Sequence, residues 1–271
     1  MSLPSNVHIS SHPCLQAKLS QLRSQSTSPR ETRDLVKEIA SILGVEAFAN
    51  GLKLTKTGTD RTPLGVEYET QGIDPADLAL VPILRSGLGM VDCQFTSTST
   101  STELPPHPIS PSLRRVKKLT LYLYLTALND LLPAAVPIYH LGLFREKLTL
   151  QPVEYYNNLP FHRSELSPAS PASLDPTTNT AASTLAVLLD PIIATGATAE
   201  AAIQLLREWG VKKVIMLSVL GSEDGVKRAA EVWKDGVEVW VGAVDEKCNE
   251  KGMIVPGVGD IGDRLFVAIG K

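Results

Sequence analysis

The chain has 271 residues, of which 43% are hydrophobic, and its formal net charge is −3. That length is sufficient to bury a core, and the near-balanced charge excludes the basic surface of a nucleic-acid-binding protein. No apolar run reaches the ~18 residues of a membrane span, and the N-terminus shows no signal-peptide pattern, so we expect no membrane partner. The three cysteines are scattered without a C-x-x-C pair. This favours a reducing compartment, the cytoplasm, over a disulfide framework or a zinc site.

The predicted elements begin with a helix near residue 28. Ser28, Pro29 and Glu31 fit a capping box with proline at the first helical position. Apolar residues then recur at helical spacing at Leu35, Val36, Ile39, Ile42 and Leu43. Three apolar runs further along the chain predict strands, at Leu78–Leu84, Val136–Phe144 and Leu185–Leu189. The first is apolar throughout, as expected of a strand covered on both faces.

The last third of the chain alternates helix and strand patterns. Apolar residues at helical spacing over Ala199–Trp209 predict a helix, and Gly210 follows where a helix commonly ends. Val214–Leu220 and Val237–Val244 predict two further strands. Strand, loop, helix and strand in this order are typical of a parallel sheet. The predicted class is therefore α/β, with a central parallel sheet flanked by helices.

Two stretches interrupt this order. Residues 164–184 are rich in Ser, Pro, Ala and Thr, which predicts a flexible loop. Residues 93–126 begin with a Ser/Thr tract, and removing them would join residues 88–92 to residues 127–132 in one amphipathic helical pattern. We therefore predict a single domain over residues 1–271 in which 93–126 is an insertion, either lineage-specific or a translated intron.

The strongest local signal for chemistry lies at residues 188–198. An apolar strand ends in Asp190, a short Thr/Gly loop follows, and a helix begins after it. Backbone N–H groups, threonine hydroxyls and the positive end of the helix would surround a small volume suited to a phosphate monoester. Ligands of open α/β sheets bind at the ends of the strands, where this carboxylate could accept hydrogen bonds from ribose hydroxyls. On composition alone, an ordinary capped turn between strand and helix is equally consistent.

Four segments of the chain together resemble the uracil phosphoribosyltransferases, a family of type I phosphoribosyltransferases. Most of that class has two adjacent acidic residues before the phosphate loop, and the uracil enzymes have the pair found here, Asp190 followed by Pro191. The resemblance implies the type I phosphoribosyltransferase fold with a small hood region. It also implies the reaction, in which uracil and phosphoribosyl pyrophosphate give UMP and pyrophosphate in pyrimidine salvage. The four segments are 81–92, 140–146 with 150–157, 188–198 and 245–266.

The resemblance further implies which residues form the site. Asp190 would hold the ribose, and Arg85, Arg145 and Asp260 would manage the diphosphate, with Mg²⁺ at Asp260 directly or through water. These four residues form the predicted catalytic set. The predicted phosphoribosyl pyrophosphate loop, whose last four residues hold the 5-phosphate, is Asp190, Pro191, Ile192, Ile193, Ala194, Thr195, Gly196, Ala197 and Thr198. Glycines let a backbone approach a flat ring, and the predicted uracil site is Ile254, Gly259, Asp260 and Ile261.

Three residues depart from the family pattern. Ser86 replaces a usual alanine and adds a hydroxyl beside the phosphate-binding loops. Ala197 replaces a glycine, which would cost about 1 kcal/mol if the position requires positive φ. Ile261 replaces an alanine beside the base. The pocket would shrink if the Ile261 side chain points inward, whereas function would survive if only its main chain contacts uracil.

The main functional hypothesis is therefore a pentosyltransferase acting on uracil. The alternative is a protein of the same fold that has lost catalysis and serves as a regulatory or ligand-binding module, which the insertion and Ala197 keep open. The family implies a homo-oligomer, a dimer or larger. Some relatives are activated by GTP, and the sequence does not decide whether this chain is.

Overall fold

The computed structural model describes residues 2–91, 128–146, 152–160 and 183–267. Its centre is a seven-stranded sheet with the strand order β1-β11-β9-β7-β4-β5-β6. Every neighbouring pair is parallel except the last, in which β6 runs antiparallel to β5. This arrangement confirms the predicted α/β class. The strands are β1 Val7–Ile9, β4 Leu78–Leu84, β5 Leu141–Arg145, β6 Pro152–Asn157, β7 Leu185–Leu189, β9 Lys213–Ser218 and β11 Val237–Val241.

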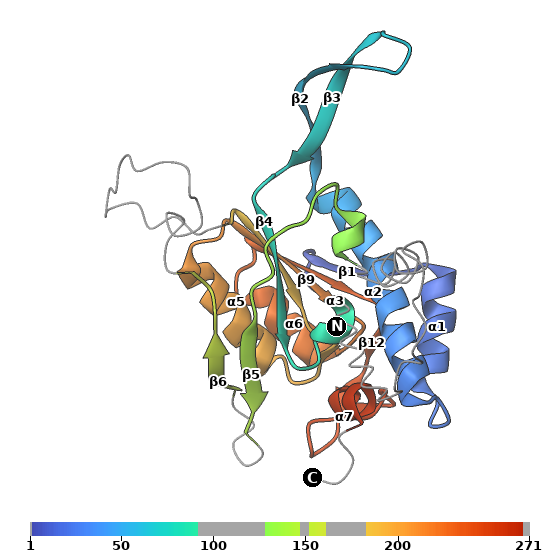
Figure 1. The fold of residues 1–271 in the computed structure, drawn as a ribbon. Helices are drawn as coiled ribbons and strands as arrows, with labels where there is room; N and C mark the ends of the chain where they lie inside the picture. Colours follow the sequence, from blue (N-terminus) through green and yellow to red (C-terminus); the bar gives the residue numbers. More distant parts are fainter. Residues whose placement is uncertain (1, 92–127, 147–151, 161–182, 268–271) are drawn as a thin grey trace, which may run out of the picture.

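Helices cover both faces of the sheet (Figure 1). One face packs on α1, Pro13–Arg23, α2, Pro29–Gly51, and α7, Ile261–Phe266; the other packs on α5, Ala197–Trp209, and α6, Glu223–Glu231. Successive residues of β4 alternate between the two hydrophobic cores. This alternation explains why the strand is apolar throughout. Among the helices that the structure describes, none combines the length and the apolar character needed to cross a membrane.

The structure confirms the predicted start of one helix, α2, and the predicted end of another, α5. Ser28 accepts a hydrogen bond from the backbone N–H of Glu31, and the Glu31 carboxylate accepts one from the N–H of Ser28 at 2.8 Å, which completes the capping box of α2. Gly210 adopts the left-handed conformation at the end of α5. Strands β4 and β7 have the predicted bounds, and α5 begins two residues earlier than predicted, at Ala197.

Two predicted strands are each divided in the structure. The run 214–220 becomes β9 and β10, Leu220–Ser222, and the run 237–244 becomes β11 and β12, Val244–Asp245. The later pieces form a second sheet with β8, Ile192–Ile193, in the order β12-β10-β8. The division arises because the N–H groups of residues 219 and 220 both donate to the carbonyl of Pro191, at 3.0 and 3.1 Å. This pairing turns the chain from the main sheet toward the loop that follows β7.

The third predicted strand, 136–144, is shorter than expected. Strand β5 begins at Leu141, and residue 138 contributes only an isolated bridge to β4. Pro137 interrupts this run before β5, and a proline cannot donate to a sheet ladder. The predicted extension of the strand is therefore irregular backbone.

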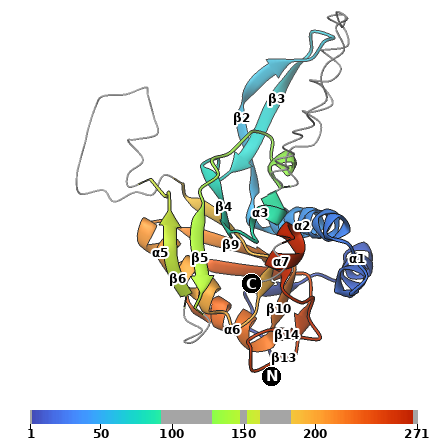
Figure 2. The ribbon, with the colours of Figure 1, turned by 60° about the horizontal axis from the view of Figure 1, so that its bottom comes forward.

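A long hairpin was not predicted. Strands β2, Lys53–Arg61, and β3, Glu67–Asp74, pair antiparallel and project away from the rest of the molecule in both ribbon views (Figures 1 and 2). Leu54 and Leu64 are 69% and 90% exposed, and every residue of β2 is exposed. Neither strand has one apolar face against a core, so the period-2 signal that identifies half-buried strands is missing.

The predicted insertion 93–126 and most of the predicted loop 164–184 lie outside the described residues. The segments that flank the insertion, α3 (Leu88–Val91) and the 3₁₀ helix η1 (Asn129–Leu131), both contact α2. Leu128 packs so closely there that a Cβ on Gly44 would lie 2.3 Å from its Cδ2 atom. A single continuous helix across the two flanks stays a prediction for a chain without residues 93–126.

Candidate active site

A cavity of about 330 Å³ opens at the carboxyl ends of β4 and β7. Its wall combines the loops after these strands, the start of α5, parts of β5 and β6, and residues 252–262. Ligands of open parallel sheets bind at this edge. Pro191 and Ala197 do not line the cavity, and both are buried. The predicted site residues that line it are Arg85, Asp190, Ile192, Ile193, Ala194, Thr195, Gly196, Thr198, Ile254, Gly259, Asp260 and Ile261.

The loop between β7 and α5 has the geometry of an anion site. Gly196 precedes the helix in the left-handed conformation, with φ 76°, and a Cβ added to it would lie 2.5 Å from the carbonyl oxygen of Gly225. Thr195 and Thr198 line the cavity on either side of this turn. The first N–H groups of a helix have no intrahelical partner, so they are available to a bound anion.

The start of α6 supports this loop from behind. The Ser222 hydroxyl donates to the carbonyl of Ala194 at 2.5 Å and accepts from the N–H of Gly225 at 3.0 Å. A Cβ on Gly225 would lie 2.1 Å from the same Ala194 oxygen. Helix α6 therefore determines the position of the loop by direct contact with its backbone. The sequence did not identify Ser222 or Gly225, because both belong to a later segment.

Ala197 takes a regular helical position. It is the first residue of α5 and is 3% exposed. Among the described non-glycine residues, Val267 alone has a positive φ. The residue of this turn that needs a positive φ is Gly196, and not Ala197. The cost of about 1 kcal/mol that a left-handed alanine would carry is therefore absent. One of the two features that kept a non-catalytic function open loses its force.

Asp190 is a buried carboxylate at the centre of the cavity wall. It is 7% exposed, and the Ser86 hydroxyl donates to its Oδ1 atom at 3.0 Å. Burial raises the pKa of Asp190 to about 7, and hydrogen bonds from Ser86 and from the Ile192 N–H oppose that rise. Nearby cations would favour the ionised form. The serine that departs from the family pattern thus contacts the predicted ribose-binding residue.

The two predicted arginines belong to neighbouring strands. Arg85 follows β4 and is exposed, with its guanidinium carbon 5.9 Å from the ring centre of Phe266. The loop after it packs tightly, since a Cβ on Gly87 would lie 2.3 Å from the carbonyl oxygen of Leu189. Arg145 ends β5, which is parallel to β4, so both backbones reach the same sheet edge. The side chain of Arg145 lies outside what the structure describes.

The loop before α7 forms the remaining wall. Asp260 caps α7 by accepting from the N–H of Asp263 at 3.1 Å, and it stays exposed at the cavity. Gly257 and Gly259 are left-handed, with φ 62° and 74°. Ile261 is 6% exposed and belongs to the hydrophobic core. This packing favours the alternative in which its main chain, and not its side chain, borders the base.

The carboxylates of the site suit a metal that arrives with a diphosphate. The described residues contain no group of three or more His, Cys, Asp or Glu side chains arranged around one metal position. Asp260 offers one exposed carboxylate at the cavity. Mg²⁺ commonly uses one or two carboxylates and takes its other ligands from phosphate oxygens and water. The residues present therefore fit a substrate-borne Mg²⁺ better than a resident metal centre.

The model of the uracil phosphoribosyltransferase family matches residues 9–101 and 123–268, which include every predicted site residue. The chain belongs to the uracil phosphoribosyltransferase family. The match is interrupted at residues 102–122, inside the predicted insertion.

Individual relatives agree with this membership. Uracil phosphoribosyltransferase of Roseiflexus castenholzii is 36% identical over 260 residues, covering 96% of this chain and 97% of the relative. The enzyme of the same name from Halalkalibacterium halodurans is 34% identical over 262 residues, covering 97% and 98%. Among solved structures, the AQ2163 protein of Aquifex aeolicus has a TM-score of 0.70 at 28% identity, covering 97% of this chain and 98% of that one.

Several residues of this cavity were not singled out from the sequence. Leu143, Phe144 and Met253 line the wall, and Phe144 lies 6.0 Å from the ring of Tyr155, measured between ring centres. Tyr155, from β6, lies in the same wall. Its 53% exposure and its place in the wall favour a part in the site. Single apolar residues in strands carry no sequence signal that separates a cavity wall from a core.

Proposed function

We propose that the chain transfers the phosphoribosyl group of phosphoribosyl pyrophosphate to uracil, forming UMP and releasing pyrophosphate in pyrimidine salvage. The observation that supports this most directly is that three differently built loops meet at one cavity. They are the loop after β4 with Arg85, the loop after β7 with Asp190, and the glycine-rich loop with Asp260. Family membership and the names of the relatives support uracil as the base.

The 5-phosphate is bound by residues 195–198 in this proposal. The turn at Gly196 and the first turn of α5 supply backbone N–H groups, and Thr195 and Thr198 supply hydroxyls. Asp190 accepts hydrogen bonds from the ribose hydroxyls. Its burial and the hydrogen bond from Ser86 restrict the orientation of the carboxylate. A sugar phosphate held at both ends presents its C1 atom in a defined place, and such positioning accounts for a large part of catalysis.

Arg85 and Arg145 bind the diphosphate in this proposal, and Asp260 holds the metal that accompanies it. Guanidinium groups can bind phosphate oxygens through paired hydrogen bonds. Asp260 would hold the accompanying Mg²⁺, directly or through a water molecule, and the metal would neutralise part of the charge of the leaving group.

The chemical step exchanges one bond at the ribose C1 atom. The bond to the diphosphate oxygen breaks with its electron pair leaving on pyrophosphate, and the ring nitrogen of uracil forms the new bond and loses its proton. Because bond breaking leads, positive charge develops on the sugar. The protein contributes chiefly orientation, electrostatic stabilisation of the two charged fragments, and exclusion of water that would hydrolyse the activated sugar.

The proposed activity predicts a specific product pattern. With phosphoribosyl pyrophosphate and Mg²⁺, radiolabelled uracil should be converted to UMP, whereas adenine and hypoxanthine should remain unchanged. Thin-layer chromatography of the three reactions separates the candidate functions. A nucleotide from a purine alone would assign a different base, and no nucleotide from any base would favour the regulatory module. Parallel rates with and without GTP would decide whether GTP activates the reaction, and cell fractionation would test the cytoplasmic location.

A homo-oligomer, a dimer or larger, is part of the proposal. The β2–β3 hairpin supports it, because an isolated two-stranded hairpin is marginally stable in water and this one has exposed apolar residues along its length, such as Leu54, Val66 and Tyr68. Light scattering of the purified protein should give a mass at least twice that of the chain. A monomeric mass at the concentrations used for activity would overturn this part of the proposal.

We also propose that residues 93–126 are an insertion. Val91 and Leu128, on either side of it, are both buried in the same core. A variant in which Asp92 is joined to Ala127 should therefore fold and retain UMP formation, measured beside a variant that lacks only 102–122. A folded but inactive deletion variant would show that the segment contributes to the site. Peptides from 93–126 in the natural protein, detected by mass spectrometry, would exclude a translated intron.

A further inference from the structure

The glycine-rich loop that precedes α7 has little side-chain packing of its own. Between β14, Ile254–Val255, and α7, Gly257 and Gly259 are left-handed, and Pro256, Gly259 and Asp260 are exposed. Val258, 5% exposed, contributes the buried apolar side chain of this stretch. Such a loop has many accessible conformations when it is not held from outside. Its position at the cavity therefore depends on contacts with other elements.

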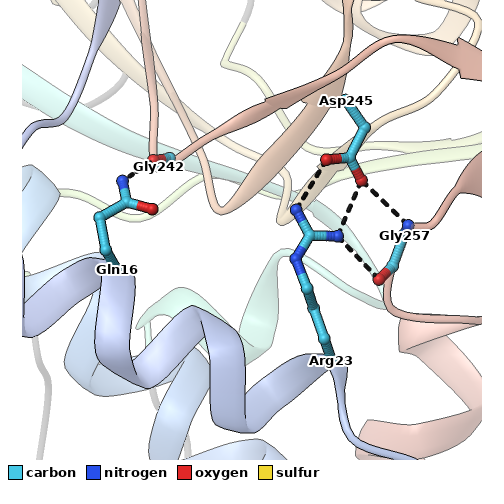
Figure 3. Close-up of polar contacts among 5 residues, drawn as sticks. All are labelled: Gln16, Arg23, Gly242, Asp245 and Gly257. Carbon is cyan, nitrogen blue, oxygen red and sulfur yellow. Dashed lines mark hydrogen bonds and ion pairs between the residues drawn. The ribbon is translucent and has the colours of Figure 1, made fainter.

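Arg23, the last residue of α1, supplies the first of these contacts (Figure 3). Its guanidinium forks onto Asp245, with Nη1 to Oδ2 at 2.8 Å and Nη2 to Oδ1 at 2.7 Å, and Nη1 also donates to the carbonyl of Gly257 at 3.0 Å. Asp245 Oδ2 in turn accepts from the N–H of Gly257 at 2.9 Å. Both backbone groups of Gly257 are thus engaged in one closed network.

Asp245 is suited to hold this network. It ends β12 and is 8% exposed. Burial would raise the pKa of its carboxyl, but the hydrogen bonds from Arg23 and from the Gly257 N–H outweigh that effect and hold the pKa below its usual value. The carboxylate is therefore charged at neutral pH. If Arg23 were removed, the buried charge of Asp245 would keep, within the described part of the chain, only the hydrogen bond from the Gly257 N–H.

Arg264 makes the reciprocal contact from α7. Its Nη1 atom donates to the carbonyls of Leu22, at 2.6 Å, and Val258, at 2.8 Å, and its Nη2 atom donates to the carbonyl of Ser24 at 3.2 Å. The carbonyl groups at the end of α1 lack intrahelical partners, so this arginine caps the helix from outside. Each of the two segments thus provides an arginine to the other.

Helix α1 is itself firmly attached to the sheet. Leu15, Leu19 and Leu22 are at most 2% exposed. Gln16 donates through Nε2 to the carbonyl of Gly242 at 2.8 Å, just after β11 (Figure 3), and to that of Ser10 at 2.9 Å. The end of α1 can therefore act as a rigid reference for the loop.

We propose that Arg23 is a positioning residue for the base: through Asp245 and Gly257 it holds the loop 256–260 where its backbone can meet the pyrimidine ring. This inference rests on the proposed function. The 5-phosphate loop has its own support from α6 through Ser222 and Gly225, and neither Arg23 nor Gly257 is among these contacts. Loss of Arg23 should therefore affect uracil more than it affects phosphoribosyl pyrophosphate.

The test compares Arg23→Met and Arg23→Lys with a matched control, Lys18→Met. Lys18 also lies on α1 and forms an ion pair with Glu38 of α2 at 2.5 Å, so its partner belongs to a helix and not to the loop 256–260. In Arg23→Met we expect the KM for uracil to rise on the order of tenfold or more, with the KM for phosphoribosyl pyrophosphate within about twofold to threefold of wild type. Arg23→Lys keeps a positive charge beside Asp245 but cannot make the paired hydrogen bonds of the guanidinium. Its KM for uracil should therefore lie between those of wild type and Arg23→Met. Lys18→Met should match wild type.

A second readout does not depend on activity. Hydrogen exchange should be faster in peptides covering 249–263 of Arg23→Met than in the same peptides of Lys18→Met, and unchanged in peptides covering 190–200. Unchanged exchange in 249–263 would overturn the role of Arg23. Faster exchange with an unchanged KM for uracil would show that the loop is held but that the base does not depend on it, which also overturns the proposal. A wild-type protein that makes no UMP, with the exchange difference present, would instead place the failure in the proposed function.

Discussion

Replacing Asp260 by alanine should abolish UMP formation, with kcat reduced on the order of a thousandfold or more. The carboxylate is exposed at the cavity and is the acidic residue expected at the diphosphate and its Mg²⁺. Without it, the Mg²⁺ that accompanies the diphosphate would lose an anionic ligand, and the leaving group would then be less well neutralised. Single-turnover formation of UMP at saturating substrates measures this loss without a contribution from product release.

Alanine also removes the cap of α7, so this effect must be separated from the chemical one. Asp260 accepts from the N–H of Asp263, and loss of an N-cap typically costs about 1 kcal/mol. Asp260→Asn and Asp260→Ser preserve a capping oxygen but remove the charge. All three variants should lose turnover, whereas only the alanine variant should unfold at a clearly lower temperature. Wild-type rates in Asp260→Asn would mean that the charge at this position has no part in the reaction.

The parts of the site that were predictable from sequence are local in the chain. Residues 188–198 carry an apolar strand, a carboxylate, a threonine and glycine turn and a helix start in one stretch, and the structure shows these elements in that order. The carboxyl ends of β4 and β7 are adjacent because the two strands pair in parallel. Consequently Arg85 and Asp190, identified separately, line the same cavity.

The parts that were missed depend on contacts between distant segments. The Ser86–Asp190 hydrogen bond joins residues 104 apart, and the Arg23–Asp245 pair joins residues 222 apart. Neither leaves a periodic or local pattern. The β2–β3 hairpin was missed for a different reason: every residue of β2 and most residues of β3 are exposed, so no continuous buried face imposes alternation on the sequence.

Asp190 illustrates why a functional residue can oppose stability. The carboxyl is nearly fully buried, and its pKa is raised from 3.8 to about 7. Because the pKa of Asp190 is higher in the folded protein than in the unfolded chain, protonation of Asp190 stabilises the folded protein. This stabilisation is lost as the pH rises from about 4 through about 7. Each pKa unit corresponds to about 1.4 kcal/mol, so the ionised carboxylate could destabilise the folded protein by up to roughly 4 kcal/mol above that pH.

Asp190→Asn should therefore change activity and stability in opposite directions. We expect kcat/KM for phosphoribosyl pyrophosphate to fall on the order of a hundredfold, because the amide is a weaker acceptor for the ribose hydroxyls than a carboxylate. Near pH 8 the variant should unfold at a higher temperature than wild type, and the difference should shrink as the pH is lowered to about 5. Thermal unfolding followed by circular dichroism across this pH range provides the measurement.

Ser86→Ala provides the matched control, since it leaves the carboxyl in place and removes the hydroxyl that donates to it. That hydrogen bond lowers the pKa of Asp190, so its loss should raise the pKa further. In a plot of kcat/KM for phosphoribosyl pyrophosphate against pH, the loss of activity at low pH, here called the acid limb, should then begin at higher pH. Activity well above that pH should change little. If Asp190→Asn is less stable than wild type near pH 8, or if Ser86→Ala leaves the acid limb in place, the buried charge is not what couples this site to pH.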